Sequence, residues 1–329
     1  MLWKNTHIQL PYNIGLAHKR FKLLRTKLRS DPILYDKYKN TIESYVTKGY
    51  ARKLTNTEAS QVSDRTWYLP HFPVVRPDKE KIRVVKDAAA MYKGQGLNTC
   101  LVTGPDLLHS LPGSINRLRK SRYAVVADVE EMFHQVRVPE DDTDSLRMLW
   151  TDDIYSDEVY TMKMLVHIFG AKDSPACAMY ALLRSARDNF DKFDPLTIET
   201  ILKCFYMDDL LTSVDSLDDA CNLANELIIL LKTRGFRLTK FTSNSPDVLA
   251  SLPASEVSQK AFMNIGDKQV EKALGVKWDI SSDIFTFNFT IPDSPDTKRG
   301  ILKVTASLFD PLGYVTPFLL KPKILLREL

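Results

Sequence analysis

Cysteine is scarce in this chain. Its four cysteines, at positions 100, 177, 204 and 221 of 329 residues, lie far apart and form no C-x-x-C pair. No histidine stands at the spacing of a zinc-ligand motif, so neither a disulfide framework nor a zinc site is expected. This cysteine usage suits a reducing compartment.

Long apolar runs are also missing. The most apolar stretches, such as LIILL at 227–231, are far too short to span a bilayer, and the N-terminal MLWKNTHIQL has no signal-peptide core. We therefore expect a soluble, intracellular, cytoplasmic protein with no membrane partner. No Asp-Ser/Thr-Gly triplet occurs, so aspartic-protease chemistry is not expected.

The chain does contain an uneven distribution of charge. Hydrophobic residues make up 44% and charged residues 26%, as in soluble globular proteins of one large domain or two or three subdomains. Residues 1–87 hold 18 Lys and Arg against 8 Asp and Glu, whereas the remainder holds 27 against 33. A basic first part suits a polyanionic partner; a well-solvated helical surface is the alternative.

Hydrophobic periodicity indicates alternating strands and helices. Residues 12–60 predict two helices separated at Ser30-Asp31-Pro32, and residues 104–121 predict a helix that starts at Pro105-Asp106 and breaks near Pro112-Gly113. The later elements predicted are strand 123–128, helix 174–190, strand pair 203–213, helix 217–236 and strands 273–278 and 284–289. This β-α-β-β-α-β order predicts an α+β fold with an antiparallel sheet and helices on one face.

Two adjacent carboxylates interrupt the apolar stretch CFYMDDLL, which contains Asp208 and Asp209. The strand YAVVAD ends in Asp128, and if it lies beside the hairpin, three carboxylates meet at one edge of the sheet. Such anions repel unless a cation lies between them, and hard Mg²⁺ prefers carboxylate oxygens. Two such ions about 3.5–4 Å apart support in-line phosphoryl displacement. The alternative is a polar turn, which Asp also favours.

Several motifs in order resemble one family. Tyr206-Met207-Asp208-Asp209 resembles the Y-x-D-D box of reverse transcriptases, and ADVEEMFHQVRV resembles their first aspartate motif. Segments along residues 3–329 resemble the polymerase region of BEL/Pao-type LTR retrotransposons: LPYNIGLAHKR, WYLPHFPVVRPDKEKIRVV, MYKGQGLN, TGPDLL, FGAKDSPA, GFRLTKFTSNSP, ALGVKW and LFDPLGYVTPF. The resemblance implies an RNA- and DNA-directed DNA polymerase with a right-hand fold of fingers, palm and partial thumb.

The resemblance also implies the catalytic residues. Asp128, Asp208 and Asp209, with the carbonyl of Val129, would bind two Mg²⁺ ions, for which Mn²⁺ can substitute. Lys240 would protonate pyrophosphate; an ordinary surface lysine is the alternative.

Nucleotide and primer contacts follow from the same resemblance. Phe133 would lie beneath the incoming sugar and exclude a ribose 2′-hydroxyl, or else would be a core residue. Arg76 and Arg83 would bind the triphosphate, although Arg76, Lys79, Lys81, Arg83 and Lys86 can equally form a solvated hairpin face. Phe169, where many relatives have glutamine, and Gly170 would contact the nucleotide by packing and backbone approach. The residues implied to contact primer or template are Tyr206, Met207, Leu274, Gly275 and Trp278, and the alternative for the last three is an ordinary hydrophobic hairpin.

Six segments are expected along the chain. They are an N-terminal helical extension (1–66), fingers (67–120 and 139–172), palm (121–138 and 173–285, with the YMDD hairpin and primer grip) and the start of a thumb (286–329). With no room for an RNase H domain after Leu329, we expect a polyprotein fragment or a truncated genomic copy. The expected partners are an RNA or DNA template with its primer, dNTPs, and other pol polyprotein domains, with virus-like particles as a location for the full element. The alternative function is a catalytically inactive remnant or a domesticated nucleic-acid-binding module.

Overall fold

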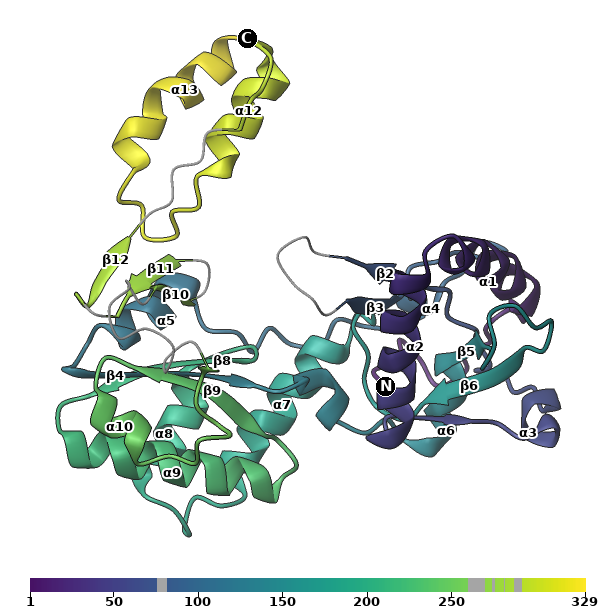
Figure 1. Cartoon of the computed structure of the whole chain (residues 1–329), viewed down its shortest axis with the longest axis horizontal. Coiled ribbons are helices and arrows are strands. Elements are labelled where there is room, and N and C mark those ends of the chain that lie inside the picture. Colours follow the sequence, from purple (N-terminus) through teal and green to yellow (C-terminus); the bar gives the residue numbers. More distant parts are fainter. Residues whose placement is uncertain (76–81, 260–269, 274–275, 281, 287–291) are drawn as a thin grey trace. The chain divides into compact units, whose positions relative to one another are not determined.

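The computed structural model describes all residues except 76–81, 260–269, 274–275, 281 and 287–291 (Figure 1). The chain forms two compact units, each built from two separate stretches of sequence. Unit 1 comprises Met1–Leu107 and Glu131–Ala181, and unit 2 comprises Leu108–Glu130 and Leu182–Leu329.

Two long helices begin unit 1. They are α1 (Ile14–Arg29) and α2 (Pro32–Thr47), and the predicted break between them is confirmed. The Asp31 carboxylate starts α2 by accepting a hydrogen bond from the Leu34 N–H at 2.9 Å, while a proline occupies the first turn. The other helical segments of this unit are α3 (Asn56–Ser60), α4 (Leu97–Cys100), α6 (Glu140–Thr143) and the 3₁₀ helices η1 (Met132–Gln135) and η2 (Asp144–Leu146).

The strands of unit 1 form one small sheet and one hairpin. Strands β1 (Ala51–Lys53), β6 (Tyr160–Met164) and β5 (Arg147–Trp150) pair antiparallel in that order, and β2 (His71–Val74) pairs with β3 (Arg83–Lys86). Helix α1 packs on β5 and β2. The buried rings of Tyr38 and Trp150 stack with centroids 5.5 Å apart, which ties α2 to the sheet.

Unit 2 is built on a four-stranded antiparallel sheet. Its order is β7 (Phe205–Tyr206), β8 (Asp209–Val214), β4 (Tyr123–Val129), β9 (Leu238–Ser243). The sheet explains why the carboxylates interrupt an apolar stretch: each side of the hairpin continues as a largely buried strand.

Helices cover one face of this sheet. Helix α9 (Leu217–Thr233) packs against β4, β8 and β9, and α8 (Pro195–Lys203) and α10 (Pro246–Ala250) lie on the same side (Figure 1). Helix α7 (Ser174–Arg187) spans the sequence boundary between the two units.

The opposite face carries α5 (Leu111–Leu118) and a second sheet, which the expectation of helices on one face did not include. That sheet has the order β10 (Val270–Ala273), β11 (Val276–Asp279), β12 (Ile284–Thr286). The Trp278 ring packs with Leu118, Ala124 and Leu211 in a shared core. Residues of β4 therefore alternate between two covered faces.

Two sequence predictions were wrong in detail. The helix expected to break near Pro112 begins there instead, because Ser110 accepts a hydrogen bond from the Gly113 N–H and a proline is tolerated in a first turn. The strand that completes the four-stranded sheet is β9, whereas the segment ALGVKW belongs to the second sheet.

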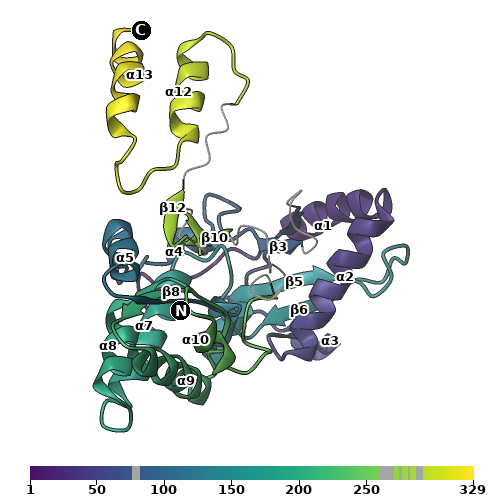
Figure 2. The same ribbon diagram turned by 60° about the vertical axis from the view of Figure 1, so that its left-hand side comes forward.

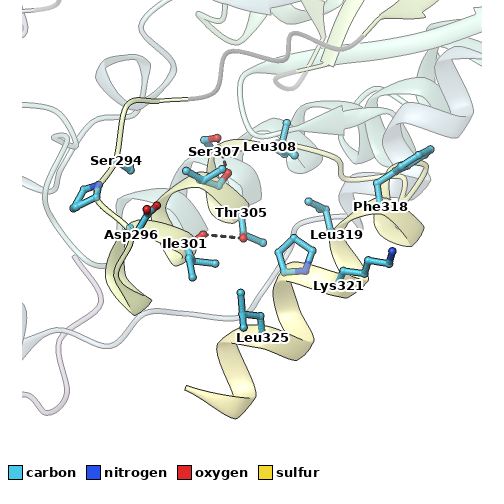
Figure 3. A pocket seen from close by; sticks show the side chains of 14 residues that line it. Ser294, Asp296, Ile301, Thr305, Ser307, Leu308, Phe318, Leu319, Lys321 and Leu325 are labelled. Carbon is cyan, nitrogen blue, oxygen red and sulfur yellow. Dashed lines mark hydrogen bonds between the residues drawn. The ribbon is translucent and has the colours of Figure 1, made fainter.

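The C-terminal segment forms two helices side by side, α12 (Lys298–Ser307) and α13 (Thr316–Glu328) (Figure 2). A cavity of about 560 Å³ lies between them, lined mainly by apolar side chains such as Ile301, Phe318 and Leu325 (Figure 3). Among the described residues, no helix is both long and apolar enough to cross a membrane.

Candidate metal centre

A tight hairpin presents the two adjacent aspartates. Tyr206 pairs with Asp209, so Met207 and Asp208 form a two-residue turn between β7 and β8. Met207 has φ = 55°, and a positive φ at the first central residue alone is the pattern of a type II′ turn. A non-glycine residue in this region is strained, which is common at functional sites.

Strand pairing brings the third aspartate to this turn. Asp128 lies directly opposite Asp209 in the register of β4 and β8. The Val129 N–H donates a 2.7 Å hydrogen bond to the Asp208 carbonyl oxygen, which fixes the turn against the end of β4. Asp128, Asp208 and Asp209 are thus gathered at one edge of the sheet, as the sequence predicted.

The pKa of Asp209 reflects this crowding. Burial, the carboxylate of Asp208 and that of Asp128, in that order, raise it from 3.8 to about 7, while Lys240 acts in the opposite direction. A carboxyl group with so high a pKa lacks a sufficient positive neighbour. This environment therefore favours a proton or a cation at Asp209.

Lys240 is directed to this edge by an irregularity of β9. The register between β4 and β9 shifts between Val126 and Asp128, and Lys240 has φ = 57° within the resulting bulge. Its Nζ lies 2.7 Å from an Asp128 carboxylate oxygen, although 64% of the lysine side chain is exposed. The lysine is thus part of the carboxylate cluster, where the sequence left an ordinary surface position open.

Arg237, which was not among the predicted site residues, stabilises the same edge. Its guanidinium lies 3.1 Å from both Glu130 and Glu256, and its carbonyl oxygen accepts a hydrogen bond from the Glu130 N–H. The residue fixes the chain just after Asp128. Its proximity to Lys240 in RLTK was the available signal.

The donor set fits hard divalent cations. All three side chains offer carboxylate oxygens, the ligands that Mg²⁺ and Mn²⁺ prefer, and a cation beside Asp209 would offset the repulsion from the two neighbouring carboxylates. Within the described part of the chain, the one trio of potential ligands with atoms all within 4.8 Å of one another is His167, Asp173 and Cys177. The three aspartates are more open than that.

Four of the five residues predicted to contact nucleotide are described, and all four lie in unit 1. The rings of Phe133, in η1, and Phe169 lie 4.6 Å apart at 54°. Gly170 has φ = 112°, and a Cβ there would lie 2.3 Å from the Lys86 carbonyl oxygen. Only glycine permits this close approach of the loop to β3.

The basic hairpin face is only partly described. Arg83 is exposed on β3, consistent with either a phosphate contact or a solvated face. Lys86 contradicts the solvated-face alternative, because it is 1% exposed with Nζ 4.1 Å from the Tyr45 ring centroid. Burial lowers its pKa to about 7. Arg76, Lys79 and Lys81 lie outside the described residues.

The residues predicted to contact primer or template differ in exposure. Tyr206 and Met207 are half-buried at the hairpin. Trp278 is completely buried and donates a 2.8 Å hydrogen bond from Nε1 to Asp283. Its side chain therefore supports the sheet and has no free surface for a primer. Leu274 and Gly275 lie outside the described residues.

Comparisons with known proteins give one family match near the C-terminus and solved structures with a similar mixed α/β fold. A family model described as "Pao retrotransposon-like RNaseH-like domain" matches residues 297–329. This match covers α12 and α13, which the sequence analysis interpreted as the start of a thumb. A comparison with curated protein sequences found no match.

Solved structures similar to this chain include several of the foamy viral protease-reverse transcriptase. One, in complex with dsDNA, has a TM-score of 0.54 at 16% identity and covers 83% of this chain and 46% of that one. The dRH form in complex with dsDNA has a TM-score of 0.51 at 15% identity and covers 80% of this chain and 37% of that one. A complex with an RNA/DNA hybrid has a TM-score of 0.51 at 14% identity and covers 83% of this chain and 30% of that one. The chain spans less than half the length of these proteins, and at such identities the likeness shows a shared fold.

Proposed function

We propose that the chain is a reverse transcriptase of retroelement origin, extending a primer with dNTPs on an RNA or DNA template. The observation that carries the proposal is the pairing of Asp128 with Asp209 beside the Met207-Asp208 turn, in a site that raises the pKa of Asp209 to about 7. Three carboxylates that need a cation suit phosphoryl transfer. The right-hand architecture, with unit 2 containing the palm sheet, belongs to this proposal.

The residues of the aspartate cluster would bind metal ions and release a proton. Asp128, Asp208 and Asp209, with the Val129 carbonyl, would hold two Mg²⁺ or Mn²⁺ ions. Such ions, when bound, activate the primer 3′-hydroxyl and stabilise leaving pyrophosphate. Lys240, now paired with Asp128 at 2.7 Å, is the group that can release a proton to pyrophosphate.

Residues of unit 1 would select the nucleotide. Phe133, supported by the Phe169 ring, would exclude a ribose 2′-hydroxyl, Gly170 would permit close backbone approach, and Arg83 with Arg76 would bind phosphates. The template-primer, dNTPs and other pol polyprotein domains are the partners in this proposal, and the cytoplasm is its location.

Primer extension tests this function. The full chain is assayed on poly(rA)/oligo(dT) with dTTP and Mg²⁺ or Mn²⁺. Wild type should extend the primer, and Asp208→Asn should reduce extension at least about 100-fold, since it removes a charged metal ligand. Asp191→Asn, an exposed aspartate between α7 and α8, is the matched control and should retain full activity.

Duplex binding, measured in parallel, distinguishes the alternatives. If wild type binds the duplex but extends no better than Asp208→Asn, the polymerase proposal fails and a nucleic-acid-binding module remains. If Asp191→Asn loses as much activity as Asp208→Asn, the assignment of the metal ligands fails.

A further inference from the structure

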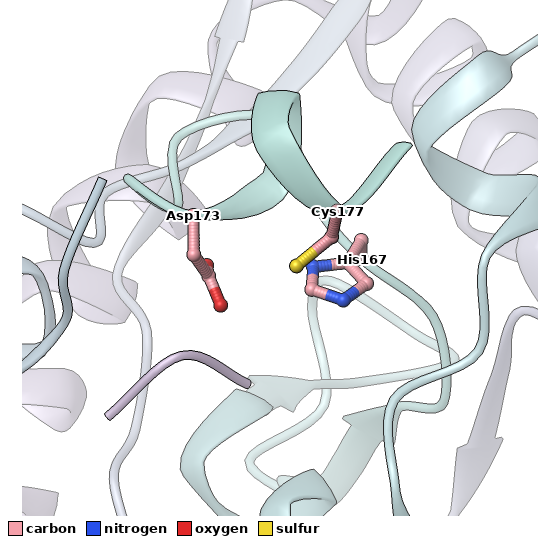
Figure 4. A group of neighbouring side chains, drawn as sticks. All are labelled: His167, Asp173 and Cys177. Atoms are coloured by element: carbon pink, nitrogen blue, oxygen red, sulfur yellow. The ribbon is translucent and has the colours of Figure 1, made fainter. Parts of the chain in front are cut away.

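A cluster of three chemically different ligands lies in unit 1, at the start of α7. His167 precedes the loop 168–172, Asp173 immediately precedes the helix, and Cys177 lies in its first turn. Ligand atoms from the three residues all lie within 4.8 Å of one another, and the cysteine sulfur faces the imidazole (Figure 4). None of these residues belongs to the aspartate centre.

Asp173 gives an independent indication of a ligand. Its side chain is completely buried, and one carboxylate oxygen, Oδ1, has no hydrogen-bond partner. The other oxygen, Oδ2, accepts a 2.9 Å hydrogen bond from the Leu2 N–H. A buried carboxylate oxygen without a partner is costly, which favours a cation at this position.

The other two side chains are available to the same cation. His167 is 4% exposed, and its imidazole offers a nitrogen donor to an ion in the cluster. Its Nδ1 lies 3.3 Å from Ser174 Oγ, a contact of the kind that orients a ligating imidazole. Cys177 is half-buried and its sulfur faces the imidazole, so the thiolate formed on metal binding would complete the ligand set (Figure 4).

We propose that His167, Asp173 and Cys177 bind one borderline-soft divalent transition-metal ion of the Zn²⁺ class. Nitrogen, oxygen and sulfur donors together suit Zn²⁺ or Co²⁺, whereas Mg²⁺ prefers oxygen ligands only. Binding forms a metal–sulfur bond and releases the Cys177 thiol proton to solvent. With three protein ligands, a fourth position is open to water.

The ion would close the loop that carries Phe169 and Gly170. His167 and Asp173 stand at the two ends of this loop, and Asn98 holds its middle by hydrogen bonds to the Gly170 carbonyl oxygen and from the Lys172 N–H, each 2.8 Å. The proposed ion is therefore structural: it would hold the loop in which Phe169 packs against Phe133. It stands independently of the proposed polymerase function.

Cobalt spectroscopy on the full chain tests the site directly. The chain is freed of metal with a chelator and titrated with Co²⁺. Wild type should bind one Co²⁺ with a thiolate-to-cobalt charge-transfer band, and Zn²⁺ should remove the band by displacement. Carboxylates alone cannot produce this band, so Asp209→Asn should retain it. Absence of the band in folded wild type overturns the proposal.

Matched variants identify the ligands. Cys177→Ser should abolish the band, and His167→Gln and Asp173→Asn should weaken Co²⁺ binding at least about tenfold. Cys221→Ser, at another half-buried helical cysteine, should leave it unchanged. A band that survives in Cys177→Ser, or disappears in Cys221→Ser, contradicts the assignment.

Thiol protection in wild type gives a readout that does not depend on the folding of any variant. Zn²⁺ should slow alkylation of Cys177 by iodoacetamide at least about tenfold, and should leave the rate at Cys221 unchanged, as mapped by mass spectrometry. Equal rates at Cys177 with and without Zn²⁺ overturn the proposal.

Discussion

At the scale of single residues, Asp209 and Lys86 show how the fold changes side-chain chemistry. Asp209 is largely buried beside two further aspartates, and burial followed by their charges raises its pKa to about 7. Lys86 is buried beside an aromatic ring, and its pKa falls to about 7. Both environments disfavour the charged form of the side chain, so both predict that stability depends on pH.

Asp209→Asn should stabilise the metal-free protein more at pH 8 than at pH 5. The folded-state pKa is raised, so the folded protein binds the proton more tightly, and stability falls as pH rises from about 4 to about 7. Removing the charge should add on the order of 1–2 kcal/mol at pH 8, after screening by solvent and salt, and little at pH 5. Urea unfolding in EDTA measures both.

Two comparisons complete that experiment. Added Mg²⁺ should stabilise wild type at pH 8 and reduce the difference in free energy of unfolding between Asp209→Asn and wild type. Asp191→Asn should unfold like wild type at both pH values. Equal gains for Asp209→Asn at pH 5 and pH 8 would show that the pKa of Asp209 is not raised in the folded protein.

Lys86→Met should stabilise the protein most below pH 7. The folded-state pKa of about 7 lies below the usual 10.5, so the unfolded chain binds more protons between these values, and wild-type stability rises with pH across that window. The gain from methionine should be about 1–2 kcal/mol at pH 6 and should shrink toward pH 10, because the Tyr45 ring only partly compensates the buried charge. Thermal unfolding at pH 6 and pH 10 measures this change in stability. Lys37→Met, at an exposed lysine, is the control, and its stability relative to wild type should not depend on pH.

Phe133→Val should increase incorporation of rNTPs relative to dNTPs, if the proposed function is correct. The phenyl ring packs on Phe169, and a smaller side chain leaves room for a 2′-hydroxyl. The ratio of rNTP to dNTP incorporation should rise at least about tenfold in single-nucleotide extension. An unchanged ratio would remove Phe133 from the role of sugar gate.

At the scale of elements, the loop 167–173 depends on its backbone conformation. Gly170→Ala should destabilise the protein by more than about 2 kcal/mol, because the alanine Cβ would meet the Lys86 carbonyl oxygen at 2.3 Å and φ is 112°. Gly235→Ala, also at positive φ but with no atom within 4 Å of the new Cβ, should cost about 1 kcal/mol. Equal costs in urea unfolding would mean that the close approach to Lys86 contributes nothing.

Elements with local signals could be predicted from the sequence. Helices α1, α2 and α9 and strands β4 and β8 follow apolar periodicity and lie where it indicated. Strand β9 was missed because the bulge at Lys240 interrupts its alternation, and a residue at φ = 57° gives no sequence signal when it is not glycine. Helix α5 was displaced because Pro112 was interpreted as a break, whereas Ser110 makes it part of a start.

At the scale of the whole molecule, the distribution of charge predicts how nucleic acid would bind if the proposed function is correct. Residues 1–87 hold 18 basic against 8 acidic residues. Affinity for an RNA/DNA duplex should fall at least about tenfold between 50 and 200 mM KCl, because phosphate contacts release counterions. Fluorescence anisotropy measures this. Two duplexes of different sequence should behave alike, and salt-independent or sequence-specific binding would contradict a backbone-binding mode.

The sequence by itself determined which residues stand at the ends of β4 and β8, because alternation and turn preference are local properties. Only the tertiary structure decided that Asp128 faces Asp209, that Lys240 reaches Asp128, and that His167, Asp173 and Cys177 converge. The spacing of cysteines and histidines along the chain predicted no zinc site, because spacing does not show which side chains become neighbours in the fold. Strand register, burial and bulges arise from long-range pairing, and these set the charges and contacts on which both candidate sites depend.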